Sequence, residues 1–332
     1  MEKIDFVVLW VDSSDKKWSQ KKQRYEKNLD SSSNQGMNGE KAFRDYGLFK
    51  YWFRGVEQFA PWVNHVFLVT DHQVPQWLNE KFEKLRVIDH SDFLPPSSLP
   101  VFNSNAIEVN IHRIPDLSEN FVLFNDDMFL ISKTKPEDFF IRNKPRDIKA
   151  LFPIKPEVNG TSNFQINDMK IINKYFTKHQ VLHSGSIFSH KYGLDNVRTL
   201  IQLPVKFVPG FFDPHGPISY LKTTFRELWT LENEILQQTT NNKFRTQDDV
   251  SNWLFRYWQL AKGEFEPRSR KFGKFVSLDG NSVQEICEII KKQRFHELCI
   301  NDGFKVDNFD SKMANIQGAL DTILPEKSSF EL

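Results

Sequence analysis

The sequence predicts an α/β protein built on a largely parallel sheet. Strand and helix signals alternate at short intervals through the first half of the chain, which is typical of a parallel sheet covered by helices. Four expected strands run directly into acidic or polar residues, and open α/β sheets bind ligands outside the carboxyl ends of their strands. The 332 residues include 31 Phe and 8 Trp, enough for a large aromatic core without disulfides.

The expected strands are short apolar runs, over residues 4–11, 64–70, 85–88 and 120–124. They are followed, in that order, by Asp12, Asp71, Asp89-His90 and Asn125-Asp126-Asp127. For Asp71 and Asp89 the simpler interpretation is turn chemistry, because Asp and Asn favour the turns that begin loops.

Helices are expected where apolar residues recur at helical spacing, over residues 43–59, 76–83, 105–114, 217–236 and 248–261. Gly263 is expected to end the last of these, and a capping box at Ser282 to open another. The stretch 28–40 lacks periodicity and predicts a loop that could act as a lid.

Composition excludes several classes of protein. The 44 Lys+Arg residues balance 43 Asp+Glu, so the chain lacks the global positive field of a non-specific nucleic-acid binder. Cys287 and Cys299 form no metal-ligand or redox spacing, and neither is expected to carry the chemistry. Because no signal peptide and no apolar run of bilayer length is seen, we expect a cytoplasmic protein whose membrane contact is peripheral.

The carboxylates of Asp126 and Asp127 follow a buried strand and are the strongest candidates for chemistry. Paired oxygens at a rigid strand end are what Mg²⁺ or Mn²⁺ on a nucleotide diphosphate requires. Adjacent acids are also common in turns, so the pair alone is moderately specific.

Two polar features of the expected helices are weaker signals. Asn105, Glu108 and His112 share one face of the helix over 105–114, where a solvated face with a capping box is the simpler interpretation. Arg44 would stand at a helix start, where the helix dipole disfavours a cation unless a phosphate is bound.

In the second half of the chain, His215 precedes the helix expected from residue 217. A helix N-terminus would keep its imidazole neutral and suited to act as a general base, although a lone loop histidine is more often a surface residue. Arg245 precedes Asp248 and Asp249, which a helix start alone would explain as an N-cap and a first-turn acid.

Together these residues resemble the Stealth family of sugar-1-phosphate transferases. The first matching block is Ile4-Asp5-Phe6-Val7-Val8-Leu9-Trp10-Val11-Asp12. The second includes Phe43-Arg44-Asp45, Ala60-Pro61-Trp62-Val63, Phe102-Asn103-Ser104-Asn105-Ala106-Ile107-Glu108, His112-Arg113-Ile114 and Phe124-Asn125-Asp126-Asp127. The short third and fourth blocks are Pro214-His215-Gly216-Pro217 and Phe244-Arg245 with Asp248-Asp249-Val250, and the third departs from the family pattern at Gly216.

The resemblance implies a Rossmann-like nucleotide-sugar transferase fold of the GT-A type with additional C-terminal helices. It divides the chain into a catalytic domain over 1–265, with an insert at about 155–205, and a mainly helical extension over 266–332. The implied reaction is attack of an acceptor hydroxyl on the β-phosphorus of a nucleotide diphosphosugar, most simply a UDP-hexose or UDP-N-acetylhexosamine, in the synthesis of capsular or other surface polysaccharide. The acceptor would be an oligosaccharide or polysaccharide, lipid-linked at the inner face of the plasma membrane.

The resemblance and the residues above give each candidate a role. His215 is the expected base, with Asp12 as the alternative. Asp126, Asp127 and Asp249 are expected to hold Mg²⁺ or Mn²⁺. The phosphate oxygens are expected to contact Arg44, Arg113 and Arg245. Other contacts to the donor are expected from Asn105, Glu108 and His112. Two other functions stay open: a glycosyltransferase that releases nucleoside diphosphate, and a saccharide-binding protein without turnover.

Overall fold

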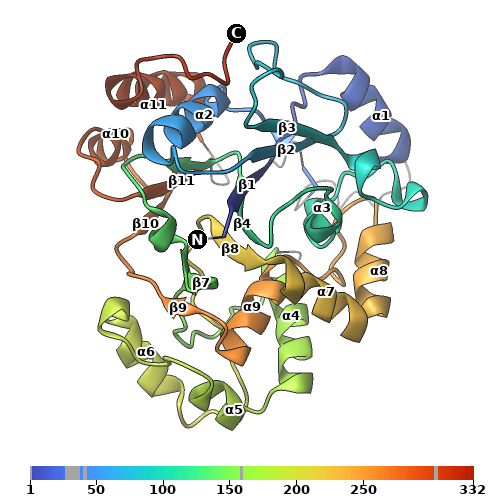
Figure 1. Cartoon of the computed structure of the whole chain (residues 1–332), viewed down its shortest axis with the longest axis vertical. Coiled ribbons are helices and arrows are strands. Elements are labelled where there is room, and N and C mark those ends of the chain that lie inside the picture. Colours follow the sequence, from blue (N-terminus) through green and yellow to red (C-terminus); the bar gives the residue numbers. More distant parts are fainter. Residues whose placement is uncertain (1, 27–37, 40–42, 158–159, 303–305) are drawn as a thin grey trace.

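A five-stranded, mostly parallel sheet forms the centre of the protein (Figure 1). The computed structural model describes residues 2–26, 38–39, 43–157, 160–302 and 306–332. The strand order is β3-β2-β1-β4-β8, with bounds β1 (Ile4–Leu9), β2 (Val66–Thr70), β3 (Leu85–Asp89), β4 (Asn120–Asn125) and β8 (Ile218–Leu221). β1 to β4 are parallel and β8 runs antiparallel to β4. The order 3-2-1-4 is that of a Rossmann-like sheet, so the α/β class is confirmed.

Alternate residues of β1 separate two apolar cores, one on each face of the sheet. Phe6 and Val8 belong to the core that contains α2 (Phe49–Phe59), α10 (Val283–Lys291) and α11 (Phe309–Ile323). Val7 belongs to the other core, with residues of α3 (Ser104–Glu108), α4 (Ser162–Tyr175), α5 (Lys178–His183), α7 (Lys222–Leu231), α8 (Asn233–Asn241) and α9 (Trp253–Lys262).

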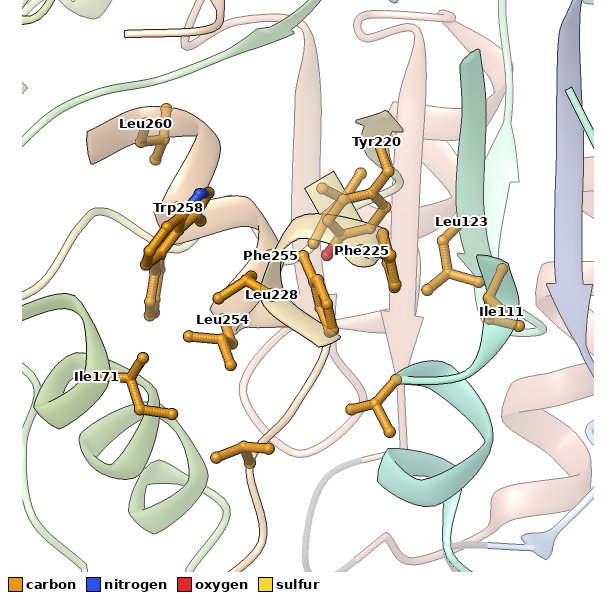
Figure 2. Close-up of a cluster of buried hydrophobic side chains, with 14 of the residues drawn as sticks. Ile111, Leu123, Ile171, Tyr220, Phe225, Leu228, Leu254, Phe255, Trp258 and Leu260 are labelled. Carbon is orange, nitrogen blue, oxygen red and sulfur yellow. The ribbon is translucent and has the colours of Figure 1, made fainter. Parts of the chain in front are cut away.

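Figure 2 shows part of this second core, where α7 and α9 pack on the sheet. Phe225 and Phe255 stack with their ring centroids 3.7 Å apart, and Phe225 also contacts Tyr220 of β8. Aromatic residues therefore link the antiparallel edge strand to the helices that cover it. Gly263 ends α9 at φ +75°, as expected for a left-handed C-cap.

The C-terminal region adds two helices and completes two further sheets. β10 (Gly273–Ser277) and β11 (Glu297–Asn301) form a sheet with β5 (Met128–Leu130), while β9 (Glu266–Pro267) joins β6 (Phe140–Ile141) and β7 (Lys144–Asp147). The expected C-terminal helices are confirmed, and the Tyr51 hydroxyl of α2 donates to Asp321 of α11 over 2.5 Å. The region after residue 265 thus shares sheets and a core with the region before it.

Several expected helices have different bounds. The segment 43–59 becomes helical at Phe49, and 248–261 becomes helical at Trp253. The segment 105–114 divides into α3 and a single 3-10 turn at Ile111–Arg113, because the Asn110 side chain donates to the Ala106 carbonyl and to Thr240. The prediction of a helix over 76–83 was wrong, because these residues form turns and Leu78 makes a β-bridge with Glu331. Most of the expected lid over 28–40 lies outside the described residues.

The largest difference is at residues 217–236, where a strand precedes the helix. Ile218–Leu221 pair with Asn120–Leu123 as the edge strand β8, and α7 starts at Lys222. The prediction of one helix from residue 217 was wrong, because pairing with β4 outweighs the local helical signal. The insert at 155–205 holds α4, α5 and α6 (Asp195–Gln202), and α1 (Lys16–Glu26) follows β1.

Asp147→Ala is expected to destabilise the fold by about 3–5 kcal/mol, because it leaves a buried guanidinium without its carboxylate. Arg256 of α9 is fully buried, donates to Asp147 over 2.7 and 2.8 Å, and also donates to the Phe212 carbonyl. Urea unfolding followed by circular dichroism measures the change.

The matched control is Glu227→Ala, which breaks the exposed pair with Lys262 and should cost about 0–1 kcal/mol. Equal unfolding free energies for the two variants would contradict a structural role for the buried pair.

Candidate active site

Asp71 and Asp89, at the ends of β2 and β3, are engaged in local contacts. Asp89 accepts a hydrogen bond from the backbone of Ser91 in a capping box and lies 2.8 Å from His72 Nδ1. Asp71 accepts from Lys21 Nζ over 2.6 Å. Asp71, His72 and Asp89 offer ligand atoms within 4.8 Å of one another. Because Lys21 already neutralises Asp71, the turn interpretation describes this group better than a cation site.

Asp12, the alternative base, also holds a turn. Its two carboxylate oxygens accept from the backbone and hydroxyl of Ser14, each over 2.8 Å. Its backbone N–H donates to Gln73, which ties the end of β1 to the loop after β2. The carboxylate of Asp12 is therefore occupied by local donors, which favours His215 as the base.

The acidic pair occupies the turn between β4 and β5. Burial raises the pKa of Asp126 well above its usual range, and the charges of Asp127 and Asp45 raise it further. Burial also raises the pKa of Asp127, against hydrogen bonds that lower it. Among the described residues Asp127 Oδ1 has no hydrogen-bond partner. Uncompensated carboxylates with an oxygen left over are the donor set that suits a hard divalent cation.

Strand β11 from the C-terminal region supports this turn. The backbone N–H of Ile300 donates to the Asp127 carbonyl over 2.9 Å, and Cys299 Sγ lies 3.5 Å from Asp127 Oδ2. The Asn301 side chain also hydrogen-bonds Asp127. Burial and the Asp127 charge raise the pKa of Cys299 well above its usual range, so the thiol stays protonated and can donate. Cys299 thus contacts a candidate metal ligand, a contact that the sequence did not predict.

Arg44 and Tyr46 lie near the turn that holds Asp126 and Asp127, which we call the acidic corner. Burial, followed by the charges of Asp302, Asp127 and Asp126, raises the pKa of Tyr46. Arg44 lies 3.9 Å from Asp302. Arg44 stands five residues before α2, so the helix-dipole argument for it was wrong, but its position beside the acids suits the expected phosphate contact.

His215 pairs with Asp213, which sequence reasoning missed. His215 Nδ1 lies 2.9 Å from Asp213 Oδ2, and the His215 backbone N–H donates to Oδ1 over 2.7 Å. Burial alone would lower the pKa of His215, but the hydrogen bond and charge of Asp213, with the charge of Asp127, together raise it. The Asp213 carboxylate holds the proton on Nδ1, which leaves Nε2 to accept one.

The helix-dipole argument for His215 was wrong, since β8 rather than a helix follows it. A carboxylate, not a helix dipole, sets its pKa, and in the opposite direction. His215 has φ +46°, a left-handed conformation that costs an L-residue about 1–2 kcal/mol. The Asp213-Pro214-His215 sequence was the signal that could have revealed the pair.

A second polar group surrounds α3. Arg245 Nη2 donates to Ser104 Oγ over 2.7 Å, and burial lowers the pKa of Arg245. Burial raises the pKa of Glu108 to about 7, against the Arg245 charge and a hydrogen bond from Asn252. Asn105 and Glu108 are buried rather than part of a solvated face, and Asn103 caps the helix. Asn105 Nδ2 lacks a hydrogen-bond partner among the described residues.

Asp249 has a different role from the one expected. Its carboxylate accepts hydrogen bonds from the side chains of Asn103, Asn242 and Thr246 and from the Thr246 backbone, at 2.7–3.1 Å. Both oxygens are occupied by neutral donors, so we leave Asp249 out of the proposed metal ligands. It also precedes α9 by four residues, so neither Asp248 nor Asp249 stands at the start of that helix.

His112 and Arg113 lie away from the acidic pair. The His112 ring packs against Phe225, which also packs on Phe121 in the amino half of β4. Phe121 is five residues before Asp126, about 16 Å along a strand. Burial, followed by the charges of Arg113, Lys222 and Arg226, lowers the pKa of His112 to about 3. The structure thus places these two residues beside α7 and away from the acidic pair.

Fold and site together define a Rossmann-like α/β protein with an acidic pair and a histidine–carboxylate pair at the carboxyl edge of its sheet. The chain belongs to the Stealth family. Conserved region 1 of Stealth proteins matches residues 2–30, and conserved region 2 matches residues 42–148.

Full-length relatives have closely related names. The chain is 46% identical over 334 residues to a receptor polysaccharide phosphotransferase of Streptococcus oralis and 45% identical to a capsular polysaccharide phosphotransferase of Streptococcus pneumoniae, with 100% of each chain covered. An exopolysaccharide phosphotransferase of Lactiplantibacillus plantarum is 42% identical over 99% of this chain and 96% of its own. Among solved structures, a galactosyltransferase with donor and acceptor sugar analogues overlaps 96% of each chain with a TM-score of 0.40 and 8% identity, a likeness that carries no argument.

Asp213→Asn should move the titration of His215 to lower pH, because the variant loses the charge that raises the histidine pKa. NMR titration of the imidazole signals measures the shift. The folded-state pKa of His215 is raised, so the pair stabilises the fold at low pH, and the difference in unfolding free energy from wild type should shrink as pH rises through that pKa.

Asp248→Asn, at an exposed carboxylate, is the control and should leave the midpoint in place. An unchanged midpoint in Asp213→Asn would show that Asp213 does not set the histidine's proton affinity.

Proposed function

We propose that this protein transfers a sugar 1-phosphate from a nucleotide diphosphosugar to a hydroxyl of a glycan acceptor during capsular or surface polysaccharide synthesis. The observation that carries the proposal is that the acidic pair lies near the His215–Asp213 pair. The two pairs are close enough for the charges of His215 and Asp127 to shift each other's pKa. The names of the full-length relatives support the same reaction class. A UDP-hexose or UDP-N-acetylhexosamine is the proposed donor.

Asp126 and Asp127 would hold Mg²⁺ or Mn²⁺, which would neutralise charge on the donor diphosphate. Two observations support this assignment: the pKa values of both carboxyl groups are raised, and Asp127 Oδ1 has no hydrogen-bond partner among the described residues. A divalent cation would stabilise both carboxylates in their ionised form. Cys299 and Asn301 would orient Asp127 through their hydrogen bonds.

His215 would act as the general base. Nε2 takes the proton of the acceptor hydroxyl while the oxygen of that hydroxyl forms a bond to the β-phosphorus. The bond from the β-phosphorus to the bridging oxygen breaks, and nucleoside monophosphate leaves. Asp213 stabilises the imidazolium that results, as the hydrogen bond between the two side chains allows.

Arg44 and Arg245 are the proposed cations for the phosphate oxygens. Arg44 lies beside the acidic corner, where the diphosphate charge would be. Arg245 lies next to Ser104 at the start of α3, and Asn105 and Glu108 of the same helix keep their proposed donor contacts. His112 and Arg113 are not carried into the proposed site, since they lie beside α7.

The identity of the released nucleotide tests the reaction. Incubation with a panel of UDP-sugars, a glycan acceptor and Mn²⁺ should release UMP and give a product heavier than the acceptor by a sugar phosphate, measured by mass spectrometry. Release of UDP would instead establish a glycosyltransferase. Donor binding without any turnover would establish a saccharide-binding protein.

Asp127→Asn should lower kcat by about 100-fold or more, because a metal ligand that stabilises developing charge is lost. Steady-state UMP release measures this, together with the Mn²⁺ concentration for half-maximal rate. Asp248→Asn, an exposed acid outside the corner, should retain wild-type rates. If Asp127→Asn were as active as this control at every Mn²⁺ concentration, the metal assignment would fail.

The two cysteines provide a matched pair of variants. Cys299→Ala removes a donor to Asp127 and should weaken Mn²⁺ binding about 10-fold, the lower end of the usual effect of losing a partner of a metal ligand. Cys287→Ala, at a half-buried position on α10, should leave Mn²⁺ binding unchanged. Manganese titration followed by electron paramagnetic resonance compares them, and equal affinities would contradict the role given to Cys299.

A further inference from the structure

Helix α6 has its polarity reversed relative to an ordinary surface helix. Asp195 and Thr199 are buried against the protein, whereas four apolar residues on or next to the helix face outward. Their side chains are 83%, 50%, 52% and 67% exposed, for Leu194, Val197, Leu200 and Ile201 respectively. A surface helix of a globular protein normally buries its apolar stripe, so this orientation requires a separate explanation.

Polar contacts hold α6 in this orientation. Asp195 accepts from Arg198 over 2.6 Å and lies 3.0 Å from Arg270 Nε. Thr199 Oγ1 accepts from the Leu151 backbone over 3.0 Å and donates to the Asp195 carbonyl. The outward apolar face is therefore a consequence of a specific anchor, since turning the helix inward would strip a buried carboxylate of its arginines.

The apolar surface extends beyond the helix on both sides in sequence. Phe188 is 45% exposed, Leu203 37% and Phe207 60%. Single exposed apolar residues are ordinary, but Leu194, Val197, Leu200 and Ile201 follow helical spacing and share one face, and an exposed apolar face of this kind marks an interaction surface. Figure 1 shows α5 and α6 at the end of the molecule opposite α11 and the C-terminus, clear of the central sheet. We refer to Phe188, Leu194, Val197, Leu200, Ile201, Leu203 and Phe207 as the α6 patch.

Exposed cations border the α6 patch. Lys206 lies next to Phe207 in sequence, and Lys271 and Lys274 line the same cavity as Leu194. Arg198, on α6 itself, has a side chain 52% exposed. Large apolar side chains on a short amphipathic helix with basic neighbours are the combination that inserts into the headgroup region of an anionic bilayer.

The same cavity connects the α6 patch to the candidate active site. Its volume is about 1060 Å³, and its lining includes Leu194 and Arg198 as well as Asp213 and His215. A glycan acceptor that reached His215 through this cavity would have its far end beside the apolar residues.

We propose that the α6 patch docks the protein on an anionic lipid bilayer, with the cavity opening toward the membrane surface. The evidence for the bilayer contact is the outward apolar face of α6 and the exposed cations beside it. The part played by a lipid-linked acceptor rests on the proposed function. Charge complementarity favours a bilayer over a second copy of the chain, since two copies would bring the same cations together.

Vesicle binding tests the docking without any substrate. The full chain should co-sediment with phosphatidylcholine vesicles that contain phosphatidylglycerol, bind phosphatidylcholine alone weakly, and dissociate as salt is raised. Leu200→Gln/Ile201→Gln should lower the vesicle partition coefficient about 10-fold or more. Leu231→Gln/Leu332→Gln, which changes two exposed apolar residues elsewhere, is the control and should bind as wild type.

Two results would overturn the proposal. One is binding that is absent in the wild type or equal in both double variants. The other is a wild-type dimer in sedimentation velocity that Leu200→Gln/Ile201→Gln converts to monomer, since a second copy would then cover the α6 patch. Thermal melts check that both variants fold. UMP release with a water-soluble acceptor should be unchanged in Leu200→Gln/Ile201→Gln, so a failure of docking and a failure of the proposed reaction are separate outcomes.

Discussion

Two neighbouring carboxylates at the end of a buried strand repel each other, and the rest of the site depends on how the protein keeps them there. Burial raises the pKa of both Asp126 and Asp127, and the charge of Asp127 raises that of Asp126 further. Hydrogen bonds from Cys299, from Asn301 and from the backbone, with the nearby charge of His215, lower the pKa of Asp127 and offset part of this effect. The remaining unfavourable energy is what a bound cation would relieve.

The support for this corner comes from the far end of the chain. β5 follows the acidic pair directly and is paired with β11, so the turn that holds Asp127 is closed by residues about 170 positions later. The C-terminal region therefore contributes directly to the candidate site. The same region supplies Asp302, which lies beside Arg44 and Tyr46.

Polarity decides two other features of the molecule. Arg256 and Asp147 form a buried pair that also binds the Phe212 carbonyl, next to Asp213 in the chain, so the histidine–carboxylate pair is anchored from the interior. On α6, Asp195 and Thr199 are buried, so the apolar residues of the helix face the solvent. In both features a charged side chain is buried, and its hydrogen-bonded partners fix the orientation of that side chain more strictly than apolar packing would.

Much of the scaffold could be read locally. The four parallel strands, the Ser282 cap and the Gly263 stop follow from apolar runs and capping chemistry among neighbouring residues. Asp126 and Asp127 were found because they follow such a run directly. Contacts between segments distant in sequence decided the rest. β8 forms because β4 offers it a partner, and Cys299 reaches Asp127 because β11 pairs with β5. Asn103 and Asn242 occupy the oxygens of Asp249, which the sequence alone suggested as a metal ligand.

The sequence by itself determined the α/β class, the order of its parallel strands along the chain, the family, and the acidic pair at the end of β4. Tertiary structure alone decided that Asp213 pairs with His215, that His112 lies beside α7, and that α6 turns its apolar face outward. The physical reason is the range of the interactions. Periodicity and turn chemistry act over a few residues and are visible in the sequence, whereas charge, burial and hydrogen bonding act through space between segments that only folding brings together.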